Sequence, residues 1–168
     1  WRASKDLRRG SYPILQEGRV VGILADWDFL KRIKGSLGIK VEEMMAARPA
    51  RVREGYPIFD VARMMVRGGY RRLPVTKWNE LTGIVTPYDI LVHLHSKGFP
   101  SLKEEKRPIS TIMRDQVKTA SPGEDVGSAV RKMMEARVGG LPVVEEGELV
   151  GIITESDITK AVDVHNKI

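Results

Sequence analysis

Two stretches of the chain place apolar residues three, four and seven positions apart, which is the spacing of one face of an α-helix. The residues are Ile58, Val61, Ala62 and Met65 in the first stretch, and Val126, Ala129, Val130 and Met133 in the second. We expect the first helix to begin at Pro57, since proline is well tolerated at the first helical position, and the second at Ser121 or Pro122. The glycine pairs at 68–69 and 139–140 are typical helix stops.

Short apolar runs separated by polar turns follow each of these helices, as expected for paired strands. The predicted strand pairs are 73–76 with 81–85 and 141–144 with 149–153, and a third pair lies upstream at 12–16 and 19–24. Further helices are predicted at 3–9, 26–33, 87–95 and 155–164, and short strands at 50–52 and 117–119. This order of elements predicts an α/β chain of the α+β type, in which small mixed sheets carry helices packed on them.

The elements recur as a repeat. Pro74, Gly83 and Asp89 return 68 positions later as Pro142, Gly151 and Asp157, and they are preceded by 61 positions by Pro13, Gly22 and Asp28. A shared offset over many positions indicates one supersecondary unit used again. We expect a partial repeat over 1–35 and repeats over 36–98 and 99–168. The first copy opens inside its first helix, and we expect that an N-terminal portion precedes it.

Each repeat contains the pattern Gly, apolar, apolar, Thr, two free positions, Asp. Thr86 and Asp89 complete it in the second copy and Thr154 and Asp157 in the third, whereas the first copy has Ala25 in place of threonine. One interpretation is a helix cap, because a hydroxyl at the N-cap accepts a bond from an orphan backbone N–H. The other is a ligand site, because a helix start also presents free N–H groups to an anion. Recurrence of the loop favours the ligand site.

The repeats resemble cystathionine β-synthase (CBS) domains over residues 41–97 and 109–166, and residues 1–35 resemble the back half of one more. The matching features are Met44-Met45 or Ile112-Met113 at the start, Leu73-Pro74-Val75 or Leu141-Pro142-Val143 after the helix, and the loop described above. The resemblance implies that the two repeats pair about a pseudo-twofold axis into a Bateman module over 41–165, with two clefts between them.

The resemblance also implies a set of binding residues. In CBS domains the residues that match Thr86 and Asp89 contact the phosphate and ribose of an adenine nucleotide, and main chain near the Leu-Pro-Val strand meets the base. The implied set in the second repeat is Tyr70, Arg71, Thr86, Pro87 and Asp89, and in the third it is Thr119, Val138, Thr154, Glu155 and Asp157. The first copy, with Ala25, is not expected to bind.

Four arginines of the second repeat, Arg51, Arg53, Arg71 and Arg72, lie at predicted strand ends near this loop. Guanidinium groups bind phosphate through two parallel hydrogen bonds, so all four are candidate ligand contacts. Ordinary surface charge explains any single one of them equally well.

Composition narrows the classes of function. The 168 residues are 42% hydrophobic, carry a net charge of +6 and include no cysteine, which excludes disulfides and thiolate metal sites and favours an intracellular, cytoplasmic protein. No apolar run reaches the length of a membrane span. Basic residues are in excess over the front part of the chain. We interpret this excess as a solvated charged surface rather than a nucleic-acid site, but both interpretations stay open.

We find no set of residues for catalysis and therefore do not expect an enzyme. No phosphate-binding glycine loop of a known type occurs. His93 and His95 are two positions apart and diverge on a helix, and His165 lies near the end, so no metal site is expected.

The leading hypothesis is a non-catalytic regulatory module that senses energy or metabolite level by binding AMP, ADP, ATP or S-adenosylmethionine, with no required cofactor. A homo-oligomer, such as a dimer of CBS modules, and an effector protein or domain are the expected partners, and no membrane is. The alternatives are an oligomerisation scaffold with empty clefts and a nucleic-acid binder that uses the basic N-terminal half.

Overall fold

The computed structural model describes residues 10–98 and 105–165, with side chains up to residue 160. The chain divides into two compact units. Unit 1 combines residues 1–47, 120–143 and 151–168, and unit 2 combines residues 48–119 and 144–150. The helix predicted at 3–9 lies outside the described residues.

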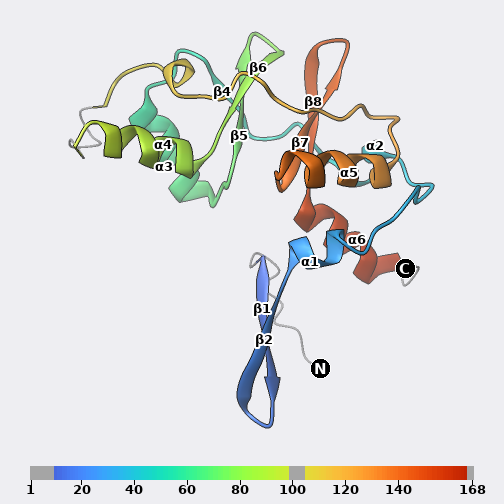
Figure 1. Ribbon diagram of the computed structural model, residues 1–168. Helices are drawn as coiled ribbons and strands as arrows, with labels where there is room; N and C mark the ends of the chain where they lie inside the picture. The colour runs from blue at the N-terminus through green and yellow to red at the C-terminus, as the bar shows by residue number, and fades with distance from the viewer. Residues whose placement is uncertain (1–9, 99–104, 166–168) are drawn as a thin grey trace. The chain divides into compact units, whose positions relative to one another are not determined.

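Unit 2 is built on a small mixed sheet. Its elements are β4 (Val52–Arg53), α3 (Ile58–Gly68), β5 (Leu73–Lys77), β6 (Glu80–Val85), α4 (Pro87–Ser96) and a 3₁₀ turn, η2 (Ile109–Thr111). Strand β4 runs parallel to β5, and β5 pairs antiparallel with β6. Figure 1 shows α3 and α4 beside each other next to this sheet. The predicted apolar face of α3 is buried in the hydrophobic core of unit 2.

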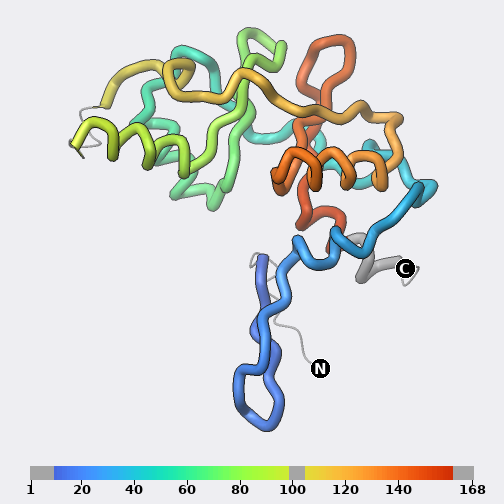
Figure 2. The backbone as a smooth tube through the Cα atoms, viewed as in Figure 1, coloured from blue at the N-terminus to red at the C-terminus, as the bar shows by residue number. Residues whose placement is uncertain are grey.

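Unit 1 contains one whole hairpin, the helices that follow the hairpins, and the part of a second hairpin that lies outside residues 144–150, which belong to unit 2. The N-terminal part has β1 (Ser11–Gln16), β2 (Arg19–Ala25) and α1 (Asp26–Leu30), and the chain then reaches α2 (Val41–Met44) and β3 (Ala46–Ala47). The later part has α5 (Val126–Ala136), β7 (Gly140–Glu145), β8 (Glu148–Thr154) and α6 (Glu155–His165). Figure 2 lets the reader follow the chain from α1 to α2, where Ile39 accepts a hydrogen bond from the backbone N–H of Val126.

The start of each repeat packs with the body of the other. Strand β3 comes from the start of the second repeat, yet it pairs with β8 of the third through Ala46 and Ile152. In unit 2 the matching segment of the third repeat bridges Arg114 to Ile84 of the second. The repeat limits 36–98 and 99–168, and the pairing about a pseudo-twofold axis, stay predictions.

This exchange explains the glycine of the recurring loop. A Cβ atom on Gly83 would lie 2.5 Å from Sδ of Met113, and one on Gly151 would lie 2.3 Å from Sδ of Met45. The two methionines therefore occupy the space that a side chain would need. Repeated Met45 and Met113 are packing residues of the exchanged segments.

Several predicted bounds in the third repeat are wrong. Residues 117–119 form no strand; a single parallel bridge joins Ala120 to Val143. Helix α5 begins at Val126 rather than at 121 or 122, because the Asp125 side chain caps it by accepting from the N–H of Gly127 at 2.8 Å. It ends before the glycine pair, at Arg137 in the left-handed region with φ 53°. Helix α1 also ends early, at Leu30.

The predicted fold class is confirmed, since small sheets carry helices packed on them. The three predicted hairpins are all present, and α4 and α6 each lie within one residue of their predicted ends. Within the described residues, no helix combines the length and the apolar character needed to cross a membrane.

Candidate functional site

The loop that begins α4 forms a closed capping box. The Thr86 hydroxyl donates to Oδ2 of Asp89 at 2.6 Å, and the Thr86 backbone N–H donates to the same oxygen at 2.8 Å. The Asp89 N–H donates back to the Thr86 hydroxyl oxygen at 3.4 Å. The prediction of a cap is confirmed, and one carboxylate oxygen, Oδ2, is fully used by it.

The loop that begins α6 in unit 1 repeats this geometry. The hydroxyl and the N–H of Thr154 donate to Oδ2 of Asp157 at 2.6 Å and 2.9 Å. The backbone N–H of Glu155 donates to the carbonyl of Gly139 at 3.2 Å, which places the Val138–Gly139 segment beside this loop. Val138, Thr154, Glu155 and Asp157 are therefore gathered in unit 1.

The two loops differ at the second carboxylate oxygen. Nε of Arg114 donates to Oδ1 of Asp89 at 2.9 Å, and the Asp89 side chain is only 9% exposed. The position that matches Arg114 in the other copy is Ala46, which has no group to offer Asp157. Sequence reasoning missed Arg114, although its unequal counterpart 68 positions earlier was a visible signal.

The predicted arginines separate into two groups. Arg71 and Arg72 directly precede β5, whose Leu73 pairs with Val85 just before Thr86, so these two lie at the Thr86 end of the sheet. Arg53 pairs with Thr76, near the β5–β6 turn and thus at the other end of the hairpin. The structure does not bring Arg53 to the Thr86 loop. Arg51 directly precedes β4, two residues before Arg53.

The structure also locates the remaining predicted binding residues. The Tyr70 ring packs over Gly68 at the end of α3, where a Cβ would meet it at 2.1 Å. Pro87 is exposed at the first position of α4. Thr119 belongs to unit 2, whereas the Thr154 loop belongs to unit 1.

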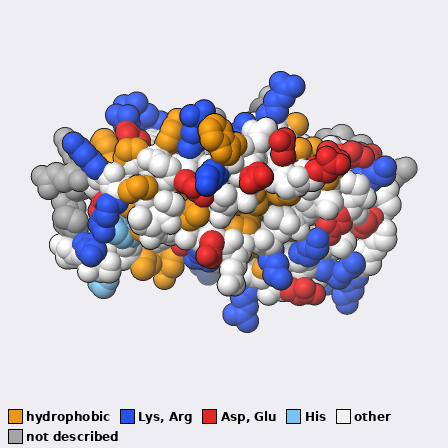
Figure 3. All heavy atoms as spheres, turned by 90° about the horizontal axis from the view of Figure 1, so that it is seen from above, with side chains coloured by type: hydrophobic (Ala, Val, Ile, Leu, Met, Phe, Trp, Pro, Cys, Tyr) orange, Lys and Arg blue, Asp and Glu red, His pale blue; other side chains and the backbone are white. Residues whose placement is uncertain are grey.

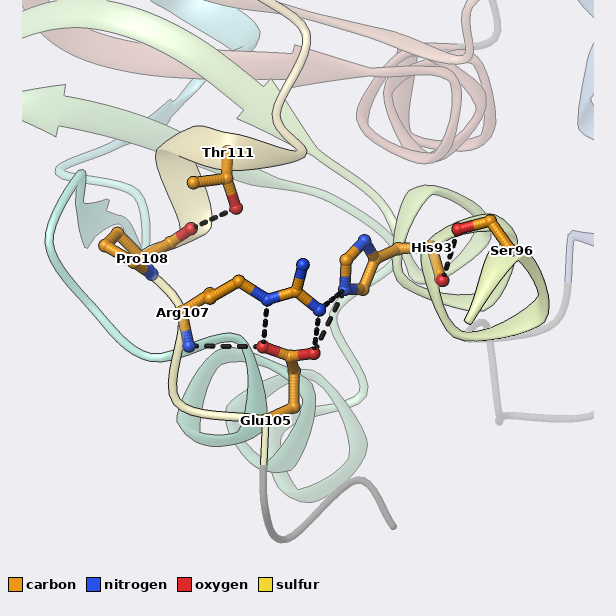
Figure 4. A network of polar contacts seen from close by, with 6 residues as sticks. All are labelled: His93, Ser96, Glu105, Arg107, Pro108 and Thr111. Carbon is orange, nitrogen blue, oxygen red and sulfur yellow. Dashed lines mark hydrogen bonds and ion pairs between the residues drawn. The ribbon is translucent and has the colours of Figure 1, made fainter. Parts of the chain in front are cut away.

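A polar cluster in unit 2 was not predicted. Figure 4 shows the Glu105 carboxylate facing both the Arg107 guanidinium and the His93 ring. Nε of Arg107 donates to Oε1 of Glu105 at 2.8 Å, and Nε2 of His93 lies 3.1 Å from Oε2. The hydrogen bonds of Arg107 lower the pKa of the buried Glu105 carboxyl to about 2.

This cluster holds the start of α3. The backbone carbonyls of Arg107 and Glu105 accept from the N–H groups of Ile58 and Phe59 at 2.9 Å and 3.1 Å, which are orphan donors of a helix start. Its geometry fits a structural clasp between α4 and the segment that follows it. Among the described residues no group of three histidine or acidic side chains is arranged to hold a metal ion.

Charge is mixed over the visible surface. On the face seen in Figure 3, lysine and arginine side chains lie among aspartate and glutamate side chains.

Comparison with known proteins identifies the repeats. The family model of the CBS domain matches residues 41–96 and 109–164. Protein MJ1225 of Methanocaldococcus jannaschii is 30% identical over 162 residues, which are 90% of this chain and 58% of that protein. Its crystal structure, described as that of a proposed archaeal homologue of g-AMPK, aligns with a TM-score of 0.77 at 28% identity, over 93% of this chain and 60% of that one.

Two further relatives bear on function. The CBS domain pair of protein MJ0100, solved with 5′-methylthioadenosine and S-adenosyl-L-methionine, aligns with a TM-score of 0.63 at 26% identity, over 75% of this chain and 97% of that one. A homoserine O-acetyltransferase of Methanococcoides burtonii is 36% identical over 124 residues, but these are 73% of this chain and only 24% of that enzyme. The chain spans a little over half the length of MJ1225. It belongs to the CBS-domain family.

Proposed function

We propose that this CBS-domain chain is a non-catalytic regulatory module that binds adenosine-type ligands at its two Thr–Asp loops. The observation that carries the proposal is the same hydroxyl–carboxylate arrangement at the starts of α4 and α6. In each loop Oδ2 is held by the cap, so the carboxylate is fixed in orientation and a ribose hydroxyl can donate to Oδ1. The MJ0100 pair, solved with two adenosine compounds, supports this choice of ligand.

The two sites differ in the charge that they offer. Around Asp89 lie Arg114 and the Arg71–Arg72 segment, and guanidinium groups favour phosphate. Around Asp157 the matching positions are Ala46 and Gly139–Gly140, and Glu155 follows Thr154. We therefore assign AMP, ADP or ATP to the Asp89 loop, and an adenosine with a neutral or cationic 5′ group, such as 5′-methylthioadenosine or S-adenosylmethionine, to the Asp157 loop.

Isothermal titration calorimetry with AMP, ATP, 5′-methylthioadenosine and S-adenosylmethionine tests the assignment. We expect T86A/D89A to lose the phosphorylated ligands and T154A/D157A to lose the other two. Asp28→Ala is the matched control, because Asp28 caps α1 by accepting from the N–H of Ala25 at 3.0 Å in the copy that lacks the threonine. Unchanged affinities in both double variants would overturn the proposal.

An exposed apolar face supports the proposed homo-oligomer. Val66 of α3 is 84% exposed, and Tyr88, Leu91 and Val92 of α4 are 65%, 56% and 48% exposed. The three α4 residues are spaced i, i+3, i+4 and share one face of the helix. Burial of such a face between two copies removes apolar surface from water, and regulatory output would pass to an effector through a ligand-dependent change in packing.

The rival function is a scaffold in which the Thr–Asp loops only cap helices. It predicts no gain in thermal stability with any adenosine compound. A bound ligand at one hundred times its dissociation constant raises the free energy of unfolding by about 2.7 kcal/mol, so a thermal-shift series decides between the two.

A further inference from the structure

A pocket of unit 2 lies at the β5–β6 turn, away from the Thr86 loop. Its volume is about 530 Å³, within the range of roughly 300–1,000 Å³ that small-ligand pockets occupy. The lining side chains that matter here are Arg51, Arg53, Tyr56, Trp78, Asn79 and Glu148. The pocket thus combines two guanidinium groups with two aromatic rings.

Arg53 belongs to the edge strand β4, and Arg51 directly precedes it. Val52 is buried between them, while Arg51 and Arg53 are exposed, as expected when alternate side chains of a strand point to opposite faces. No described residue forms an ion pair with either guanidinium. Glu148 supplies the acid of the lining, and its Oε2 accepts from Nδ2 of Asn79 at 3.2 Å.

Trp78 is exposed to solvent at the tip of the β5–β6 turn. Its side chain is 87% exposed and its φ is 57°, a left-handed conformation that is unusual for a bulky residue. Tyr56 across the pocket is 45% exposed. Burial of apolar surface does not account for two open rings beside two unpaired cations.

The repeat shows that the fold does not require these side chains. The counterparts of Arg51, Arg53, Tyr56 and Trp78 in the third repeat are Thr119, Ser121, Glu124 and Glu146. The counterpart of Trp78 in the first copy is Glu17, and both glutamates adopt the same left-handed φ, 52° and 50°. Glutamate is therefore sufficient for the turn, and the turn conformation does not explain the tryptophan at residue 78.

We propose that this pocket binds single-stranded nucleic acid, with a base stacked on Trp78 or Tyr56 and phosphates held by Arg51 and Arg53. Proteins bind single strands by this combination, because every base has a face that stacks on an aromatic ring and the backbone is anionic. The pocket opens at an exposed turn, so the strand can continue on both sides of the bound nucleotide. The inference is independent of the adenosine sites.

The test is fluorescence anisotropy with a 5′-fluorescein-labelled oligouridylate of twelve nucleotides and the intact 168-residue chain. Trp78→Gln removes the ring without adding charge, and Trp78→Glu installs the residue that the other turns carry. Loss of one stacked base weakens binding about 5- to 150-fold. We expect a decrease in that range for both variants, with 5′-methylthioadenosine binding unchanged.

R51T/R53S installs the residues of the third repeat. We expect weaker binding, and a slope of log affinity against log salt that is shallower by about 1.4, because each phosphate contact on a single strand contributes about 0.7. R32T/R131S, which removes two exposed arginines from unit 1, is the matched control and should leave affinity and slope unchanged.

Three results would overturn the inference. The first is no binding of the oligouridylate by the unaltered chain. The second is equal affinity in the Trp78 variants, R51T/R53S and the unaltered chain. The third is binding of labelled polyglutamate that the same variants abolish, without binding of the oligouridylate, which would assign the pocket to an acidic peptide.

Discussion

Gly83→Ala tests whether the exchanged segment leaves no room for a side chain at the glycine of the recurring loop. A Cβ at residue 83 would lie 2.5 Å from Sδ and 2.9 Å from Cγ of Met113, and also 2.9 Å from the carbonyl oxygen of Arg114. That carbonyl belongs to the bridge to Ile84, whose N–H donates to it at 2.9 Å. A methionine side chain can move aside, but the carbonyl moves only if the bridge moves.

The expected cost follows from these contacts. Overpacking a filled site costs about 1–3 kcal/mol, and replacing glycine by alanine in a strand returns roughly 0.5–1 kcal/mol. Taken at the middle of both ranges, the net loss in the free energy of unfolding is about 1 kcal/mol. For a chain of this size that corresponds to a fall in Tm of roughly 2–4 °C, which differential scanning calorimetry resolves.

The repeat provides graded controls. At Gly151 the atoms nearest to an added Cβ all belong to the Met45 side chain, so G151A should cost less than G83A, and M45A should remove most of its cost in a double-mutant cycle. At Gly22 the nearest atom is Cδ1 of Ile14 at 3.7 Å, so G22A should not destabilise. Equal stability changes in G83A and G22A would refute the packing argument.

Three further outcomes are expected. The pKa of Glu105 in the folded chain is about 2 and its ordinary value is 4.5, so the stabilisation that this carboxylate provides is present above pH 4.5 and is lost as the pH falls toward 2. E105Q should therefore flatten the dependence of Tm on pH in that window. An unchanged profile would contradict the role of the cluster as a clasp. R114A should remove the positive charge beside Asp89 and let calorimetry detect a second equivalent of 5′-methylthioadenosine, whereas R131A should not. V66E/L91E should lower the mass found by sedimentation equilibrium if α3 and α4 form the interface between copies, while exposed K97E should leave it unchanged.

Elements with strong local signals were predictable from the sequence. Helix α3 has an apolar face of four residues, a preceding proline and a glycine, Gly69, that ends it in the left-handed region at φ 66°, so periodicity and stop signal agree. Helix α5 has the same periodicity, but its start was predicted at Ser121 or Pro122, four to five residues too early. The N-cap is Asp125, which also accepts from the Ser36 hydroxyl at 2.7 Å and from the N–H of Gly38. A contact across almost ninety residues leaves no local pattern.

The candidate site was predictable in its chemistry and only partly in its assembly. The spacing of Thr86 and Asp89 determines a capping box within one helical turn, so that contact follows from the sequence alone. The Arg114–Asp89 pair depends on the exchange of the repeat starts, and the spacing of residues along the sequence does not reveal that exchange. Arg51 and Arg53 were assigned to the Thr86 loop because strand ends were predicted without register, and the register of β4 with β5 places Arg53 at the opposite end.

Comparison among the repeats separates what the fold requires from what it permits. Gly83 and Gly151 face the methionines of the exchanged segments, so their agreement needs no ligand to explain it. Positions 114 and 46, or 78 and 146, occupy equivalent places and carry unlike side chains. Since the fold accepts either residue there, packing within the unit does not account for the difference. A duplicated chain in this way supplies its own control, and the residues on which its copies disagree are those at which its ligands are best sought.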